Sequence, residues 1–169
     1  MPFTPYHFGP NAIIGLSLNK YIDLPVFVLT NVVVDLEVLT VVLFNLDYPL
    51  HGLCHTVLIG AIVGLICGLI AYPFRNLLKS IMSLFQLSYQ PGVTKMAVSG
   101  VLSVWLHVTL DSIVHWDVQP FWPIAGNPLF KLVSVSTIFT ICEVCFIATA
   151  VIFPALAYSA YRKRKANPN

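Results

Sequence analysis

Four stretches of the chain are each long and apolar enough to cross a lipid bilayer, and this feature constrains the fold more than any other. A helix needs about 20 mainly apolar residues to span the hydrocarbon core, and residues 24–44, 52–74, 96–114 and 132–161 meet that requirement. Charged residues make up only 9% of the 169 residues, against roughly 25% in soluble domains. The sequence therefore predicts an all-α, polytopic transmembrane helical bundle with four full spans, and it excludes a basic nucleic-acid-binding surface.

Two further helices are expected outside the four spans. Residues 8–18 form a short apolar stretch near the N-terminus, which predicts either a partial crossing of the membrane or a helix that lies in the interface. Between the second and third spans, Arg75, Lys79, Gln86 and Gln90 recur at helical spacing among apolar residues, which predicts an amphipathic surface helix ended by Pro91-Gly92. We expect one integral membrane domain over residues 1–161 and a basic cytoplasmic tail over residues 162–169.

The positions of Lys and Arg near the span ends predict the topology, because these residues favour the cytoplasmic side. Arg75, Lys79, Lys95 and the basic run at 162–165 agree on one orientation, and only Lys131 opposes it. The C-terminus is therefore expected in the cytoplasm. In the second span, glycines recur at every fourth residue, which predicts close approach of another helix: Gly60, Gly64 and Gly68.

Ionisable residues occur inside the predicted spans, where each costs about 2.5–3.5 kcal/mol on insertion scales and is functional by default. His107, Asp111 and His115 repeat at every fourth residue and are expected to stack on one helix face, as are His51 and His55 on the second span. Imidazole and carboxylate groups suit zinc and similar divalent metals. The candidate ligands are His7, Asp35, Glu37, His51, His55, His107, Asp111 and His115.

Depth in the bilayer supports a meeting of these residues. Asp35 lies 11 residues after Leu24, and His107 lies 12 residues after Lys95, so each is roughly 16–18 Å from the cytoplasmic end of its span. His7 reaches the same layer if the short first helix runs inward from an external N-terminus, and we prefer that orientation.

Two acidic residues fit the cluster less directly. Glu37 lies 200° around a helix from Asp35, so a regular helix cannot direct both at one point, and a paired surface acid is its alternative interpretation. Glu143, in the fourth span, has no evident partner. Contact with a partner helix and metal ligation remain equally open for it.

Several motifs together resemble the YdjM-like family of inner-membrane, metal-dependent hydrolases. They are the N-terminal segment ending at His7, Asp35-Leu-Glu37, His51-Gly-Leu-Cys-His55-Thr56, and His107-x-x-x-Asp111 followed by the loop to Trp122-Pro123. The resemblance extends to about Pro123. Glu37 stands where the family has a second Asp, Gly52 where Arg is usual and Thr56 where Ser is usual. The resemblance implies a bacterial inner-membrane location.

That family is in turn distantly similar to the zinc-dependent phospholipase C and single-strand nuclease superfamily, whose ligand order is matched by His7, Asp35, His51 or His55, His107 with Asp111, and His115. The final His-x-x-x-acid pair of that superfamily is absent, unless Glu143 alone replaces it. The resemblance therefore implies two ions, most simply Zn²⁺ with Mn²⁺ as an alternative, rather than three. Asp111 or Asp35 is expected to bridge them.

The leading hypothesis is a membrane-embedded, metal-dependent phosphoester hydrolase that opens to the outer face and acts on a lipid or lipid-linked substrate. Asp35, His107 and Asp111 are the predicted catalytic residues, beneath a loop at 116–128 that presents aromatic surface. Alternatives are a divalent metal-ion transporter, a bis-histidine haem carrier using His55 and His107, and a non-catalytic metal-binding protein. A transporter predicts polar groups at every depth, whereas the cytoplasmic halves of the second and third spans are almost wholly apolar. The oligomeric state is left open.

Overall fold

The described residues of the computed structural model, 5–166, form helices and connecting turns without strands, which confirms the all-α prediction. Residues 1–4 of the N-terminal motif and residues 167–169 of the expected tail lie outside this range. The elements are α1 (Pro5–Ser17), α2 (Leu24–Phe44), η1 (Leu53–His55), α3 (Val57–Ala71), η2 (Tyr72–Phe74), α4 (Arg75–Leu84), α5 (Val93–Val114) and α6 (Val135–Ala166).

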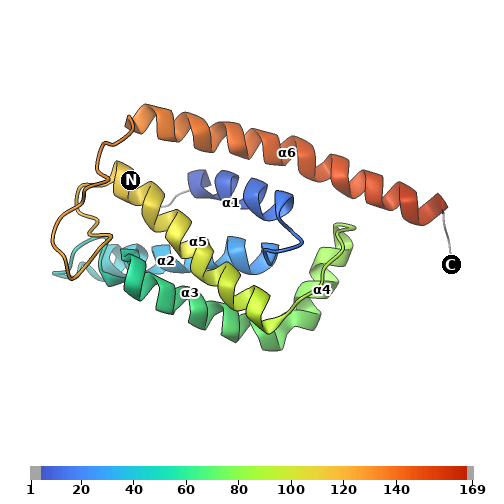
Figure 1. Ribbon diagram of the computed structural model, residues 1–169, viewed down its shortest axis with the longest axis horizontal. Coiled ribbons are helices and arrows are strands. Elements are labelled where there is room, and N and C mark those ends of the chain that lie inside the picture. The colour runs from blue at the N-terminus through green and yellow to red at the C-terminus, as the bar shows by residue number, and fades with distance from the viewer. Residues whose placement is uncertain (1–4, 167–169) are drawn as a thin grey trace.

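Four helical segments are long and apolar enough to cross a membrane, as the sequence predicts. They are Leu24–Phe44, Val57–Leu84, Val93–Val114 and Val135–Arg162. Burial differs sharply among them: 56% of the most apolar window of α5 is buried, but only 11% of that of α6. In Figure 1, α5 crosses the other helices, while α6 runs along one side of the molecule with α1 next to it. Helix α5 is therefore the central element.

The second span begins later than predicted, and the reason is a helix cap. Thr56 has an extended backbone and its side chain accepts a hydrogen bond from the Ile59 amide at 3.1 Å, so α3 begins only at Val57. His55 lies before it in the short helix η1, and His51 lies in the preceding turn. The expectation that His51 and His55 share one helix face is therefore wrong.

The third span also ends earlier than the histidine spacing suggested. Helix α5 stops at Val114, and His115 follows as an extended capping residue with φ −109° and ψ 126°. The predicted stack on one helix face is thus correct for His107 and Asp111 but wrong for His115. Two segments of irregular backbone decide where His51, His55 and His115 point.

Glycine allows α3 and α5 to pack closely, which confirms the predicted ridge. A Cβ atom added at Gly64 would lie 2.5 Å from the carbonyl oxygen of Gly100, and one at Gly68 would collide with the Met96 carbonyl. Only helices without side chains at these points can approach so far. This contact places the N-terminal end of α3 beside the polar residues of α5.

The remaining boundaries depart modestly from expectation. Helix α4 buries Leu78 and Met82, as an amphipathic surface helix should, but it ends at Leu84 rather than at Pro91. Helix α6 begins at Val135 and continues to Ala166, so the basic segment from Arg162 onward is a helical extension within the described residues. The division into a membrane domain over residues 1–161 and a cytoplasmic tail over residues 162–169 stays a prediction.

The long loop between α5 and α6 is tied to the helix ends. The Val57 amide donates to the Pro120 carbonyl at 2.8 Å. The side chain of Asn127 donates to the carbonyls of Ser112 and His115 at 2.8 and 3.0 Å. These bonds hold the loop over the end of the bundle where the candidate ligands gather.

Candidate metal centre

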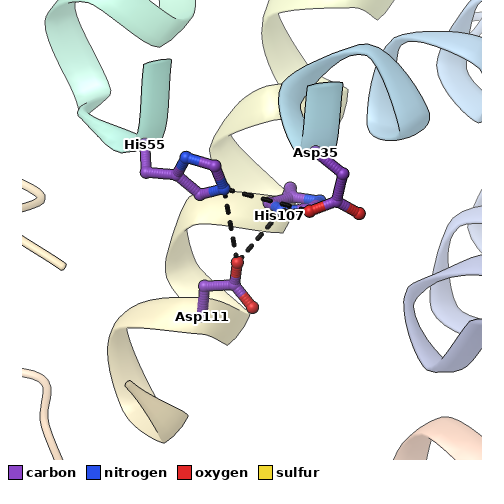
Figure 2. Close-up of side chains that lie close together, drawn as sticks. All are labelled: Asp35, His55, His107 and Asp111. Atoms are coloured by element: carbon purple, nitrogen blue, oxygen red, sulfur yellow. Dashed lines mark ion pairs between the residues drawn. The ribbon is translucent and has the colours of Figure 1, made fainter. Parts of the chain in front are cut away.

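Four side chains from three separate elements converge at one point (Figure 2): Asp35 from α2, His55 from η1, and His107 and Asp111 from α5. His107 Nε2 lies 3.0 Å from Asp111 Oδ2 and 3.4 Å from Asp35 Oδ1. His55 Nε2 lies 3.6 Å and 4.0 Å from the same two oxygens. Both imidazoles are fully buried, whereas the Asp35 side chain is 13% exposed.

Each of the two imidazoles makes a hydrogen bond through its Nδ1 atom, on the side of the ring away from the cluster. His55 Nδ1 is 2.9 Å from Glu37 Oε2, and His107 Nδ1 is 3.0 Å from Asn31 Oδ1. Both partners are acceptors, so Nδ1 must carry the proton in each ring. The Nε2 atoms then present lone pairs to the cluster, and neither has a hydrogen-bond partner among the described residues.

This arrangement fits a divalent cation. Ligand atoms about 2.1 Å from a tetrahedral zinc ion lie about 3.4 Å from one another, and the four nitrogen–oxygen distances run from 3.0 to 4.0 Å. Two neutral imidazoles and two carboxylates are also a suitable donor set. Buried Nε2 atoms without partners are costly unless something binds them. Asp35, His55, His107 and Asp111 are therefore the residues that would hold an ion.

His7 joins the cluster from α1, at the depth predicted for it. Its Nε2 atom lies 3.4 Å from Asp111 Oδ1, and its ring centroid is 4.5 Å from that of His107. Asp111 thus faces His7 with one oxygen and the other two imidazoles with the second oxygen. The bridging role expected for Asp111 or Asp35 stays a prediction.

Glu37 lies outside the group of four. Its carboxylate accepts from the backbone amides of Gly52 and Cys54 at 3.1–3.2 Å, as well as from His55. In this position it orients the ring of His55 and fixes the turn before α3, which is the usual role of a carboxylate behind a metal-binding histidine. The 200° separation from Asp35 on one helix agrees with this placement.

His51 and His115 belong to a second, neighbouring group with Asp117. The rings of His51 and His115 are 4.4 Å apart, and His51 Nδ1 lies 2.9 Å from Asp117 Oδ2. The ring of His51 is also 4.9 Å from that of His55, so the two groups adjoin. The eight predicted ligands therefore gather in one region, but they divide between two groups and a supporting residue.

The charge states of the second group suit metal binding. Burial lowers the pKa of His115, and the nearby His51 lowers it further against the opposing effect of Asp111. Burial is the largest single effect and would raise the pKa of Asp117, but the hydrogen bond with His51, the charge of His51 and backbone hydrogen bonds together outweigh it and hold the pKa below its usual value. A neutral imidazole and an ionised carboxylate are the forms that bind a cation.

A pocket of about 280 Å³ opens beside this second group. His51 and Asp117 line it, together with Tyr48 and with Trp122 from the loop between α5 and α6. The tip of that loop therefore presents an aromatic side chain next to the ligands, in agreement with the expectation for residues 116–128.

Two asparagines support the centre in a way that was not predicted: the sequence suggested Asn31 as a hydrogen-bond partner of Asp35, and Asn11 was missed. Asn31 Oδ1 accepts from both His107 Nδ1 and Asn11 Nδ2, and all three side chains are fully buried. The signal was present, because Asn31 lies one turn before Asp35 on α2 and Asn11 lies one turn after His7 on α1. Glu143, by contrast, is exposed on α6 and takes no part in either group.

Polar residues also continue below the centre, which corrects the expectation that this half of the third span is apolar. Ser103 and Ser99 are fully buried on α5. Ser103 donates to the Phe27 carbonyl at 2.5 Å, and Ser99 accepts from the Asp23 amide at 2.7 Å. Small hydroxyl residues of this kind join helices within a membrane.

Comparison with known proteins identifies the family. The family model described as "YdjM inner membrane protein" matches residues 13–167. The similarity to this family therefore continues through α6 and does not end near Pro123. His7 lies just before the matched segment. No curated protein and no solved structure matches the chain. With four candidate spans and a family match over nearly its whole length, the chain is an integral inner membrane protein that belongs to the YdjM family.

Proposed function

We propose that the protein is a metal-dependent hydrolase that cleaves a phosphoester of a lipid or lipid-linked substrate at the outer face of the membrane. One observation carries the proposal: His55 and His107 are both held through Nδ1, which leaves two buried Nε2 atoms facing Asp35 and Asp111 without hydrogen-bond partners among the described residues. The order of the candidate ligands along the sequence, which resembles that of zinc-dependent phospholipases and nucleases, supports the choice of phosphoester chemistry.

The residues divide into three roles. Asp35, His55, His107 and Asp111 hold the first ion, and His51, His115 and Asp117 hold the second, with His7 beside the free oxygen of Asp111. When bound, zinc or manganese would supply an activated water and a positive charge for the phosphoryl oxygens. Glu37 and Asn31 keep the Nε2 lone pairs of their histidines directed at the ion.

Access from the lipid follows from the pocket beside the second group. Its lining combines the aromatic side chains of Tyr48 and Trp122 with the polar side chains of His51 and Asp117. An amphiphilic substrate in the outer leaflet has its phosphate at the interface and its chains in the hydrocarbon. The aromatic part of the pocket would contact a chain while the polar part receives the phosphate.

The experiment is metal analysis combined with hydrolysis assays on purified protein in lipid. The wild type should contain about two divalent ions per chain, and His107→Ala should lose metal and activity together. Chelation should abolish cleavage, and zinc or manganese should restore it. Thr109→Val, at an exposed position half a turn from His107 on α5, serves as the control. Failure of metal-replete protein to cleave phospholipids, polyprenyl phosphates and soluble phosphodiesters would refute the proposal.

Metal-ion transport is the second candidate, and the buried serines favour it. Ser103 and Ser99 extend the polar face of α5 below His107, toward the cytoplasmic end if the predicted topology holds. Uptake of zinc into vesicles by wild-type protein, reduced by Ser103→Ala without loss of resident metal, would support transport over hydrolysis. A haem carrier is disfavoured, because Asp35 and Asp111 lie within 4.0 Å of the same Nε2 atoms that a haem would need.

A further inference from the structure

Glu143 occupies an unusual position on the membrane-facing side of α6. It is exposed, and it has no hydrogen bond or ion pair with any described residue. It lies eight residues after the start of α6 at Val135, about 12 Å along the helix axis. The neighbouring Cys142 packs against Ile113 of α5, which places Glu143 close to the level of the metal centre. An ionisable side chain at such a place is expensive if it faces only lipid.

Helix α3 shows what a lipid-facing surface in this protein looks like. Every exposed residue of α3 is apolar: Leu58, Ile62, Leu65, Ile66, Leu69 and Ile70. The exposed side of α6 differs, because Ser136, Thr140 and Glu143 lie on one face at helical spacing. Among the described residues of α2, α3, α5 and residues 135–161 of α6, Glu143 is also the only exposed Asp, Glu, Lys or Arg; the exposed Lys79 lies in the amphipathic helix α4.

This face points away from the rest of the molecule. Ile138 and Cys142 are buried toward α1 and α5, and Gly9 of α1 contacts the backbone at Cys142 so closely that a Cβ atom there would collide. Glu143 lies 100° around the helix from Cys142, and Thr140 lies 160° around it on the same outer side. Figure 1 shows α6 at the edge of the molecule, with its other side free.

We propose that this face is a dimer interface, in which α6 of one copy packs against α6 of a second copy in parallel orientation. Thr140 Oγ1 already donates to the Ser136 carbonyl of its own helix, so its oxygen retains acceptor capacity. The carboxyl group of Glu143 is of the right kind to share a hydrogen bond with a hydroxyl group of this type. In a symmetric parallel pair, residues of equal depth meet, and each Glu143 can donate to Thr140 of the other copy.

The self-complementarity of the face selects a second copy over an unrelated partner. One helix supplies both the donor and the acceptor at adjacent turns, so two identical helices satisfy both pairs at once. Small side chains at Ser136 and Ala150 on the same face allow close approach of the two backbones. Metal binding does not enter this argument, so a test of the dimer is independent of a test of the proposed hydrolase activity.

Single-molecule photobleaching in lipid vesicles, over a range of protein-to-lipid ratios, tests the proposal. Wild-type protein should form dimers, and Thr140→Val and Glu143→Leu should each weaken the association by about tenfold to a hundredfold, since two hydrogen bonds are lost. Glu143→Gln keeps a donor at the same place and should remain dimeric. Thr109→Val, an exposed threonine of α5 that also donates to its own helix, is the matched control.

The helix content of each variant by circular dichroism, together with its thermal unfolding, reports whether the fold is intact. A wild type that stays monomeric at every density would overturn the proposal. So would dimers that persist unchanged in both Glu143→Leu and Thr140→Val, since the association would then use another surface.

Discussion

The hydrogen bond between Asn31 and His107 offers the most direct test of how this site is built. Asn31 Oδ1 accepts from His107 Nδ1 at 3.0 Å and from Asn11 Nδ2 at 3.0 Å, and Asn31 is 1% exposed. The substitution Asn31→Leu keeps the approximate size of the side chain and removes the acceptor. One N–H group of His107 and one of Asn11 then lose their acceptor in a buried place, while Asn11 Nδ2 keeps its other hydrogen bond, to the His7 carbonyl.

The expected effect has two parts. Each buried donor without a partner costs about 1–3 kcal/mol, so the loss of both should destabilise the folded protein by about 2–6 kcal/mol. Removal of the group behind a metal-binding histidine typically lowers metal affinity by about 10–100-fold, because the ring of His107 is no longer fixed in orientation or tautomer. Asn31→Asp retains an acceptor oxygen and should retain most of the affinity.

Competition between the purified apo-protein and a chromophoric zinc chelator measures the affinity, and thermal unfolding of the apo-protein measures the stability. Thr30→Val is the matched control, since Thr30 is equally buried on the same turn of α2. It should leave metal affinity unchanged even if stability falls. A folded Asn31→Leu protein that binds zinc as tightly as the wild type would refute the assignment of Nε2 of His107 as a ligand.

Three further predictions concern other parts of the molecule. Trp122→Ala should raise KM for long-chain substrates more than for short soluble ones, because Trp122 lines the pocket beside His51; equal effects on both would exclude a chain-binding role. Burial raises the pKa of Asp23, so its contribution to stability is present below the unfolded value of about 3.9 and is lost as pH rises through the higher folded value. Asp23→Asn should therefore flatten that part of a pH–stability profile, and an unchanged slope would contradict the argument. Single introduced cysteines at residues 75–92 and 116–131, in a background without the native four, should react with an impermeant reagent from the inside and the outside respectively; the reverse pattern would invert the topology.

The sequence by itself determined the spans and the depth of the polar residues. A helix rises by a constant amount per residue, so position along a span converts directly into depth, and Asp35, His107 and His7 were placed in one layer before any tertiary contact was known. The same regularity made His107 and Asp111 neighbours on one face of α5. The glycine spacing likewise predicted a close helix contact, although not that α5 is the partner.

Only the tertiary structure decided which candidate ligands face one another. His51, His55 and His115 lie where the chain leaves regular helix, so helical periodicity has no power to aim their rings. Their directions depend on the Thr56 cap and on Glu37, which binds the turn before α3 from a different helix.

The separation of Glu37 from Asp35 has the same origin. Asp35 and Glu37 are two residues apart on α2, so their side chains cannot point to one place. His55 lies between them, with its Nε2 atom toward Asp35 and its Nδ1 atom next to Glu37. Asn11 and Asn31 similarly become partners only when α1 folds back on α2. Composition and spacing identify the polar side chains that need a partner inside a membrane. Which side chains pair depends on contacts between segments distant in sequence, and those contacts form only when the helices pack.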